Sequence, residues 1–270
     1  MRQHLVSSLA LAVSALAVAP AAAQTAVPSQ ARSPYVALGF AVLPDYAGSD
    51  DYRAIPFGAL SFQIEGIAVR TDGPGLAADL YNDGRLTAGL FTRWSQGRQT
   101  DQIDDAVVAL LPDVGSSLVT GGQFNYRIAR SILQLRDQIS IGGRVGVDAL
   151  GQFDGAAWQG SVSYGAMYGK RTMMSLTAAV SGFSDDYADT LFSVNAADAV
   201  ASGLPEFSAE GGIQDIGLTA VVNYRLKGPW SATGVFGFTE LVGDFANSPI
   251  VSVRGDSSQV FSGLAVGRRF

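Results

Sequence analysis

The sequence predicts an all-β protein: a transmembrane, antiparallel, up-and-down β-barrel of about 12 strands that follows a cleaved signal peptide. Three observations predict this fold. Apolar residues alternate with small or polar residues along most of the chain, which is the period of a β-strand. The alternating segments run to about twelve residues, enough for a tilted strand to cross a bilayer and longer than most strands of soluble sheets. Only 16% of residues are charged, yet beyond the leader no apolar run approaches the ~18–20 residues of a membrane helix.

Residues 1–23 are expected to be a signal peptide. Arg2 supplies the basic start, residues 5–18 form the apolar core, and Ala21, Ala22 and Ala23 provide a small-residue cleavage site. An uncleaved membrane anchor is the alternative, but the apolar run is short and lies directly before the cleavage site. We expect a flexible segment at 24–34 and the barrel at 35–270.

The mature chain lacks the residues that most catalytic and metal sites use. Cleavage removes His4, which is the single histidine, and the sequence contains no cysteine. Ser-His-Asp and Cys-His catalysis, His/Cys zinc sites and disulfides are therefore unavailable. A net charge of −6 with scattered arginines also disfavours nucleic acid as a partner, because nucleic acid requires a clustered basic face. We expect a protein that is not an enzyme, with no cofactor and no metal.

The segment 156–168 illustrates the alternation. Trp158 and Val162 lie on one face of such a strand, and Gln159 and Ser161 lie on the other. The same pattern recurs at 85–95, 118–128, 140–152 and 214–226. A soluble sandwich would expose many Lys and Glu side chains, whereas the polar face here carries Gly, Ser, Thr, Gln and occasional Arg. This distribution indicates a lipid-facing exterior and a polar lumen.

Turn residues divide the chain into its strands. Asn82-Asp83-Gly84 and Asp154-Gly155 are tight hairpin signals, and long connections lie at 44–52, 96–114, 185–211 and 243–257. The expected strands are 35–43, 53–64, 66–72, 75–81, 85–95, 116–128, 138–151, 156–168, 171–184, 212–226, 230–242 and 258–270. Ten strands is the alternative count, because 66–72 and 75–81 are short and are separated by Gly73-Pro74-Gly75. With the first strand directed outward, all four long connections lie on the extracellular side and most tight turns in the periplasm.

The C-terminus also fits a barrel. The last strand alternates and ends in Phe270, which resembles the signal read by the bacterial barrel-insertion machinery, although Arg268 stands where an aromatic residue is common. We therefore expect this machinery as a partner, and outer-membrane lipid and lipopolysaccharide as the surroundings.

The stretch PDYAGSDDYRAIP, which begins at Pro44, is the most conspicuous cluster of acids. Asp45, Asp50 and Asp51 with Ser49 are oxygen ligands of the kind that Ca²⁺ accepts, but their spacing matches no EF-hand loop. We expect a solvated connection between the first two strands rather than a metal site.

Two further segments carry acids. The adjacent pairs at 50–51 and 185–186 could be catalytic acids, but neighbouring residues on an extended chain point to opposite faces, so we expect surface charge. Residues 101–113 carry apolar residues at helical spacing, with Asp104 and Asp105 near the start, where carboxylates suit the helix dipole. We expect a short helix over the barrel mouth, and a partner-binding helix is the alternative.

Ionisable side chains occupy the lumen-facing positions. These candidates are Arg70, Arg85, Arg93, Arg127, Arg144, Arg225, Asp79 and Asp148. They could form internal ion pairs that fill a narrow barrel, or they could line a pore and set its selectivity. We favour the ion pairs, because twelve strands enclose little space once arginines fill it.

Several segments resemble the MipA/OmpV family of outer-membrane proteins. The acidic stretch resembles the signature near the start of the family, through Pro44, Asp45, Tyr46, Gly48, Ser49, Asp50, Tyr52 and Arg53. Residues 193–205 resemble the long loop of the family, and residues 241–251 (LVGDFANSPIV) resemble its C-terminal run. The resemblance spans essentially the whole mature chain.

The resemblance implies a function that periodicity alone does not. It implies a barrel in the outer membrane of a Gram-negative cell, acting as a scaffold that joins a murein lytic transglycosylase to a murein synthase. Other members are described as porin-like, so a channel for small solutes is the alternative. The resemblance supplies no catalytic residues.

Overall fold

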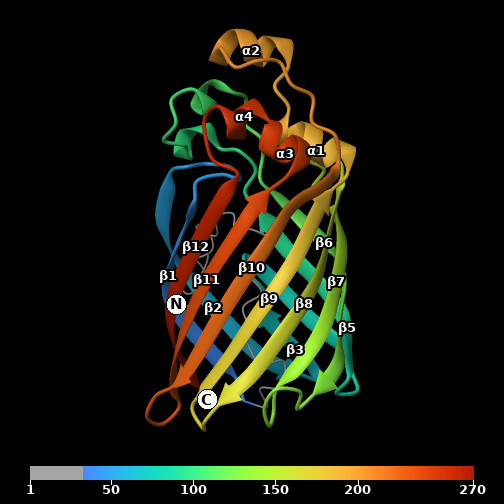
Figure 1. Cartoon of the computed structure of the whole chain (residues 1–270), viewed down its shortest axis with the longest axis vertical. Coiled ribbons are helices and arrows are strands. Elements are labelled where there is room, and N and C mark those ends of the chain that lie inside the picture. The colour runs from blue at the N-terminus through green and yellow to red at the C-terminus, as the bar shows by residue number, and fades with distance from the viewer. Residues whose placement is uncertain (1–32) are drawn as a thin grey trace, which may run out of the picture.

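The protein folds into a closed antiparallel barrel, as a computed structural model that describes residues 33–270 (Figure 1). The strands are β1 (Tyr35–Pro44), β2 (Tyr52–Ile64), β3 (Ile67–Thr71), β4 (Gly75–Asn82), β5 (Leu86–Ser95), β6 (Ser117–Arg130), β7 (Gln138–Asp148), β8 (Ala156–Tyr168), β9 (Thr172–Phe183), β10 (Gly212–Arg225), β11 (Trp230–Leu241) and β12 (Ser258–Arg269). Each strand pairs with its neighbours in the sequence, and β12 pairs with β1 to close the wall. The predicted fold class is confirmed. The expected signal peptide, 1–23, lies outside the described residues, as does the expected flexible segment except for residues 33 and 34.

Every expected strand is present, and β3 and β4 both form, so the strand count is twelve in the described part of the chain. The ends of most strands lie within one residue of the expected ones. The largest difference is in β7, which ends at Asp148 instead of at residue 151. Its carboxylate accepts hydrogen bonds from the backbone N–H groups of Leu150, Gln152 and Phe153, which folds the chain into a turn at that point.

The outer face of the barrel is apolar. In β1 and β12, Phe40 stands opposite Leu264, and the two side chains are 69% and 65% exposed, as is typical of a surface that faces lipid. Large aromatic residues on the same face include Trp94, Trp158, Tyr168, Tyr224 and Trp230. The alternate positions of each strand, which are polar or small, therefore face the interior.

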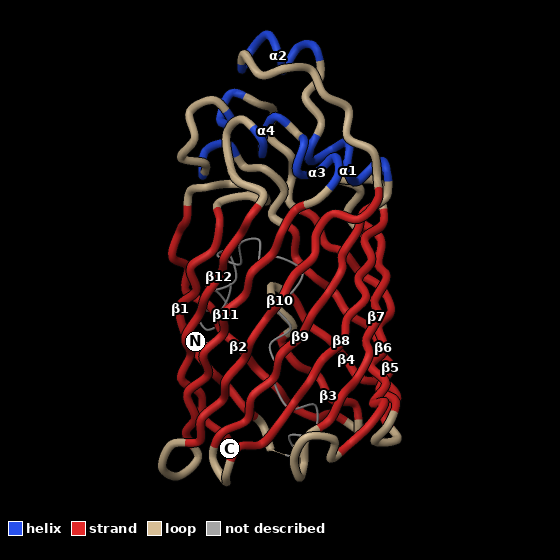
Figure 2. The backbone as a smooth tube through the Cα atoms, in the orientation of Figure 1, coloured by secondary structure: helices blue, strands red, loops and turns tan. Residues whose placement is uncertain are grey.

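The two ends of the barrel differ in their connections. Short turns join the strands at one end, the turn end, while the other end, the loop end, carries the four long connections (Figure 2). These connections contain the helices α1 (Asp185–Phe192), α2 (Ala196–Ser202), α3 (Gly243–Asn247) and α4 (Pro249–Ser252), and the 3₁₀ turns η1 (Thr100–Gln102) and η2 (Val108–Leu110). In residues 33–270, no helix has the length and apolar character needed to span a membrane.

The prediction of a helix at 101–113 is wrong. The segment forms the two short 3₁₀ turns η1 and η2 instead of one helix, and Leu111 leaves the helical region with φ −76° and ψ 159°. Pro112 explains this end, because the residue before a proline is pushed toward extended conformations.

The long connections pack together into a layer over the loop end, which we call the cap (45–51, 96–116, 184–211 and 242–257). Each of the four contributes buried apolar side chains to one cluster: Tyr46, Val108, Leu111, Val194, Leu204 and Ile250. A second cluster joins Phe192, Phe245 and Val251. Two of the buried apolar clusters therefore lie mainly in the cap, above the barrel mouth, and smaller ones lie inside the wall.

Candidate functional site in the barrel interior and the cap

Three inward-facing arginines of β3, β5 and β7 gather near the β3–β4 turn. The Arg70 Nη1 atom lies 2.6 Å from Asp79 Oδ1, and the Arg144 Nη1 atom lies 2.9 Å from Asp72 Oδ2. Asp72 belongs to the turn itself, and the charges of Arg93 and Arg70 also act on its carboxylate. Two carboxylates thus face three guanidinium groups at this point of the wall.

Arg93 is the cation of this cluster that lacks a close acidic partner. It stands opposite Gly75, directly beside the β3–β4 turn, and its Nε has no hydrogen-bond partner among the described residues. Arg144 is held in place by Asp72 and by the ring of Phe91, whose centroid lies 5.1 Å from the guanidinium carbon. Among the described residues, no carboxylate lies within ion-pair distance of Arg93, although Asp72 and Asp215 act on it from farther away.

A cavity of about 120 Å³ lies between this cluster and the cap. Its lining combines Arg93 and Arg144 with Asp215 of β10 and with the rings of Phe91 and Tyr187. Burial raises the pKa of Tyr187, a residue of α1, to about 12, so its phenol is neutral and adds no charge. The volume admits several water molecules or a small polar group.

The other predicted lumen residues lie elsewhere. Arg85 lies at the turn end, with its guanidinium carbon 5.0 Å from the ring centroid of Tyr126, whose position along β6 faces outward. Arg127 and Arg225 also lie near the turn end, where their N–H groups donate to the carbonyl groups of Arg85 and Arg171. Asp148 lies at the loop end and organises the turn after β7, where it also accepts a hydrogen bond from Ser117.

Two acidic residues of the site were missed by the sequence analysis. Asp72 has the same strand parity as Arg70, so the alternation could have placed it on the inner face. The strand expected at 66–72 ends at this residue, next to a Gly-Pro turn. Asp215 has the parity of the polar face in the strand expected at 212–226, but nothing in the sequence indicates that this strand places it in a cavity with Arg93 and Arg144.

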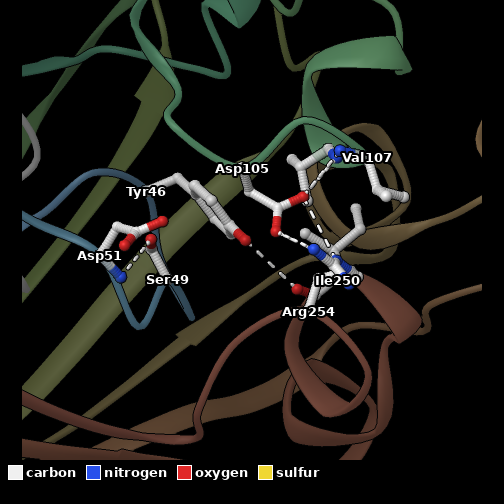
Figure 3. Close-up of polar contacts among 8 residues, drawn as sticks. Tyr46, Ser49, Asp51, Asp105, Val107, Ile250 and Arg254 are labelled. Atoms are coloured by element: carbon white, nitrogen blue, oxygen red, sulfur yellow. Dashed lines mark hydrogen bonds and ion pairs between the residues drawn. The ribbon is translucent and has the colours of Figure 1, made fainter.

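The signature stretch that begins at Pro44 is part of the packed cap. Asp45, Tyr46 and Ser49 are buried, so the expectation of a solvated connection was wrong for them, whereas Asp50 is exposed. The Tyr46 hydroxyl donates to the Ile250 carbonyl at 3.4 Å (Figure 3). A polar composition did not predict this burial, because the partners come from the opposite end of the chain.

Gln259 and Gly48 fix this stretch against the last strand. The Gln259 side chain accepts from the Gly48 N–H at 3.0 Å and donates to the Ser49 carbonyl at 2.9 Å. Gly48 has φ +98°, and a Cβ atom there would lie 2.3 Å from a methyl group of Val251. Only glycine suits both the backbone conformation and the space.

Asp105 links the second long connection to the fourth. Its carboxylate accepts from the Arg254 guanidinium at 2.6 and 3.0 Å and from the N–H groups of Val107 and Val108 at 2.9 and 2.8 Å (Figure 3). Burial acts to raise the pKa of Asp105, but these hydrogen bonds outweigh it and hold the pKa below the ordinary value of 3.8. The pair therefore stabilises the cap at neutral pH.

In the part of the chain that the structure describes, no group of three or more His, Cys, Asp or Glu side chains could hold a metal ion. The adjacent acids Asp185 and Asp186 lie in the first turn of α1, where the Oδ1 atom of Asp185 accepts from the Gly211 N–H at 2.8 Å. Their place at a helix start gives them a structural explanation.

A closed antiparallel barrel with an apolar belt outside and charged side chains inside defines a membrane-spanning β-barrel of the outer-membrane class. The family model described as "MltA-interacting protein MipA" matches residues 36–270. The chain belongs to this family.

Solved structures with similar folds include outer-membrane proteins. A NanC porin is 10% identical with a TM-score of 0.46, and the match covers 88% of this chain and 100% of the porin. An outer membrane channel from Pseudomonas putida F1 is 14% identical with a TM-score of 0.45, and the match covers 94% of this chain and 100% of the channel. No match was found among curated proteins.

Proposed function

We propose that this protein is a non-enzymatic scaffold of the outer membrane that binds a murein lytic transglycosylase, and a murein synthase with it, on the periplasmic side. The family description, which names an interaction with MltA, supports this assignment. In outer-membrane barrels the short turns face the periplasm, so the turn end is the surface that murein enzymes reach.

The observation that carries the proposal is the turn between β6 and β7 at 131–137. Leu133 and Leu135 are 79% and 80% exposed there, which places two apolar side chains together on a turn that faces water. An exposed apolar pair of this kind is a feature of protein–protein contact sites.

The β6–β7 turn is also held in shape. The carboxylate of Asp137 is buried, and it accepts from the N–H groups of residues 132–134 at 2.7, 2.8 and 2.9 Å and from the Tyr164 hydroxyl at 3.0 Å. Burial acts to raise the pKa of Asp137, but these hydrogen bonds outweigh it and lower the pKa. A turn fixed before binding loses little entropy when a partner docks.

Site-specific photocrosslinking in cells tests this assignment. A photoreactive residue at position 133 should crosslink to a murein lytic transglycosylase. The same residue at Lys227, an exposed position in the turn between β10 and β11, serves as the matched control. The double substitution Leu133→Asp and Leu135→Asp should abolish co-purification, while Lys227→Asp should not. Crosslinks to lipid alone at position 133 would refute the scaffold.

A channel for small solutes is the second candidate, and a different observation favours it. The inner face of the wall opposite the arginines carries small side chains, among them Ala179, Gly217 and Gly263. Small residues facing a cluster of cations favour a path for anions along one side of the lumen. In planar bilayers we expect conductance steps with a preference for anions, and Arg93→Gln should reduce this preference. A bilayer that stays silent with correctly folded protein excludes the channel.

A further inference from the structure

The strand ladder of the barrel is interrupted along β2. This strand pairs with β1 from Tyr52 to Ser61, but it pairs with β3 only from Ser61 to Ile64. The Leu60 N–H, next along the strand, already turns to the side-chain oxygen of Thr71 at 2.9 Å. Among the described residues, no strand pairs with residues 53–59 on this side. We call this interruption, between 53–59 of β2 and the turn at 72–74, the ladder gap.

The ladder gap lies at the depth of the apolar belt. On β1, Leu38 and Phe40 stand opposite Gly58 and Pro56, and these two apolar side chains are 71% and 69% exposed. Unpaired backbone groups in contact with hydrocarbon are strongly unfavourable, and irregular backbone at this depth occurs where it borders protein or a water-filled space. The free edge of β2 is therefore expected to border a passage or a bound ligand.

Pro56 keeps another strand from filling the ladder gap. Backbone groups alternate sides along a strand, so the nitrogen of residue 56 points the same way as the Leu60 N–H, toward the gap. Proline has no N–H to donate at the centre of this edge, and proline on an edge strand opposes pairing with further strands. The outward neighbours Ala54 and Gly58 are small and leave the edge uncovered.

Polar contacts delimit the ladder gap at both ends. At its lower rim the Trp94 N–H donates to the Pro74 carbonyl at 3.1 Å, which fixes the β3–β4 turn against β5. At its upper rim Arg53 donates to the side-chain oxygens of Gln96 at 2.9 Å and of Gln102 at 3.3 Å. The interruption is thus a bounded section of wall between two fixed edges.

The chemistry changes from apolar to cationic across the ladder gap. Ile55 and Phe57 occupy the inward positions of the free edge, where most other strands carry Gly, Ser or Thr. Just inside the lower rim lies Arg93 with its unpartnered Nε, beside the Arg144–Asp72 ion pair. The lining of the 120 Å³ cavity includes Arg93 and Trp94 of β5, and Trp94 is the residue whose N–H binds the β3–β4 turn, so the cavity reaches the lower rim of the ladder gap.

We propose that the ladder gap is a lateral portal that takes an amphiphile with one aliphatic tail and one anionic head from the bilayer. The head binds Arg93, and the tail lies along Ile55 and Phe57. Membrane lipids reach this depth of the wall without crossing the cap. The apolar side chains of Ile55 and Phe57 at the gap favour ligands that have an aliphatic tail. The inference does not depend on partner binding at the turn end.

Binding of dodecanoate to the protein in nanodiscs tests the portal. Loss of the Arg93 charge in Arg93→Gln should lower the affinity for dodecanoate about 10- to 100-fold, the range of one charge-assisted hydrogen bond. The affinity for dodecan-1-ol should be unchanged. Dodecyl phosphate should bind like dodecanoate, and dodecyltrimethylammonium should not compete. Equal binding of the neutral, cationic and anionic amphiphiles, or wild-type affinity in Arg93→Gln, would overturn the proposal.

A second pair of variants tests the route. Gly58→Trp places a bulky ring at the ladder gap and should slow or abolish dodecanoate uptake. Gly160→Trp, at an outward position with open space on the fully paired β8, is the matched control and should not. Each variant is first checked for the heat-dependent gel shift of a folded barrel. If butyrate binds as tightly as dodecanoate and Gly58→Trp has no effect, the head enters from water and the portal is refuted.

Discussion

Replacement of Asp105 by alanine tests whether the long connections form one packed cap. The carboxylate binds Arg254 in the fourth connection and closes η2 in its own connection. Alanine removes both links at once, whereas Asp105→Asn removes the charge and keeps an oxygen for the backbone N–H groups. The loss in Asp105→Asn relative to the wild type therefore reports the ion pair, and the further loss in Asp105→Ala reports the backbone hydrogen bonds.

The magnitude follows from the contacts. Two neutral-donor hydrogen bonds from Val107 and Val108 contribute about 1 kcal/mol in sum after competition with water. The ion pair adds about 1–2 kcal/mol, discounted because the Arg254 side chain is 37% exposed. Asp105→Ala should thus cost the closed cap about 2–3 kcal/mol, and Asp105→Asn about half of that. A loss of this size raises the open fraction roughly 30- to 140-fold.

Hydrogen exchange read by mass spectrometry measures this opening. Protection at 107–111 and at 249–253 should fall together in Asp105→Ala, while protection of the strands stays constant. Asp113→Asn, which alters an exposed carboxylate bonded to Thr100, is the control and should leave 249–253 protected. If 107–111 loses protection while 249–253 keeps it, the connections open independently and the single cap is refuted.

Three further predictions concern the cap and the interior cluster. Protease resistance of the cap should stay constant from neutral pH down to about 4 and should decrease at pH values below the ordinary pKa of 3.8. The reason is that the lowered pKa of Asp105 contributes stability that is lost when the carboxylate is protonated. Asp105→Asn should remove this pH dependence. Gly48→Ala should destabilise the protein by about 2–4 kcal/mol, because the new methyl group overpacks against Val251 and the backbone has a positive φ. The midpoint temperature of the heat-dependent gel shift should therefore fall, and a second change Val251→Ala should restore part of the lost stability. Arg144→Met should cost about 3 kcal/mol by leaving the Asp72 carboxylate without its close partner, and a second change Asp72→Asn should recover most of the loss in the same gel-shift assay.

The barrel could be predicted from the sequence because its rule is local. Alternation of side chains along each strand sets which face meets lipid, and this pattern located the strand ends closely. The same parity placed Arg70, Arg93 and Arg144 on the inner face. It could not place Arg85, which precedes its strand, because residues in turns follow no alternation and the nearby ring of Tyr126 attracts the cation.

The cap could not be predicted in the same way, because its contacts join segments far apart in the chain. Burial of Tyr46 and Ser49 depends on Ile250 and Gln259, which no local pattern connects to them. One local signal was overlooked: Asn195 and Asp198 form a capping box, which starts α2 inside a segment expected to be only a loop.

The seam between β1 and β12 joins strands from the two ends of the described chain, so we expect it to close late in folding. Phe270 donates its N–H to the carbonyl of Pro34, so the final residue of the chain meets the first strand. Until that contact forms, β1 has a free edge, and the hydrogen bond from Gly48 to Gln259 that ties the first connection to β12 is also missing. The time needed to close the seam therefore sets how long the edge of β1 stays exposed. During that time β1 can pair with any strand it meets, so intramolecular closure competes kinetically with aggregation.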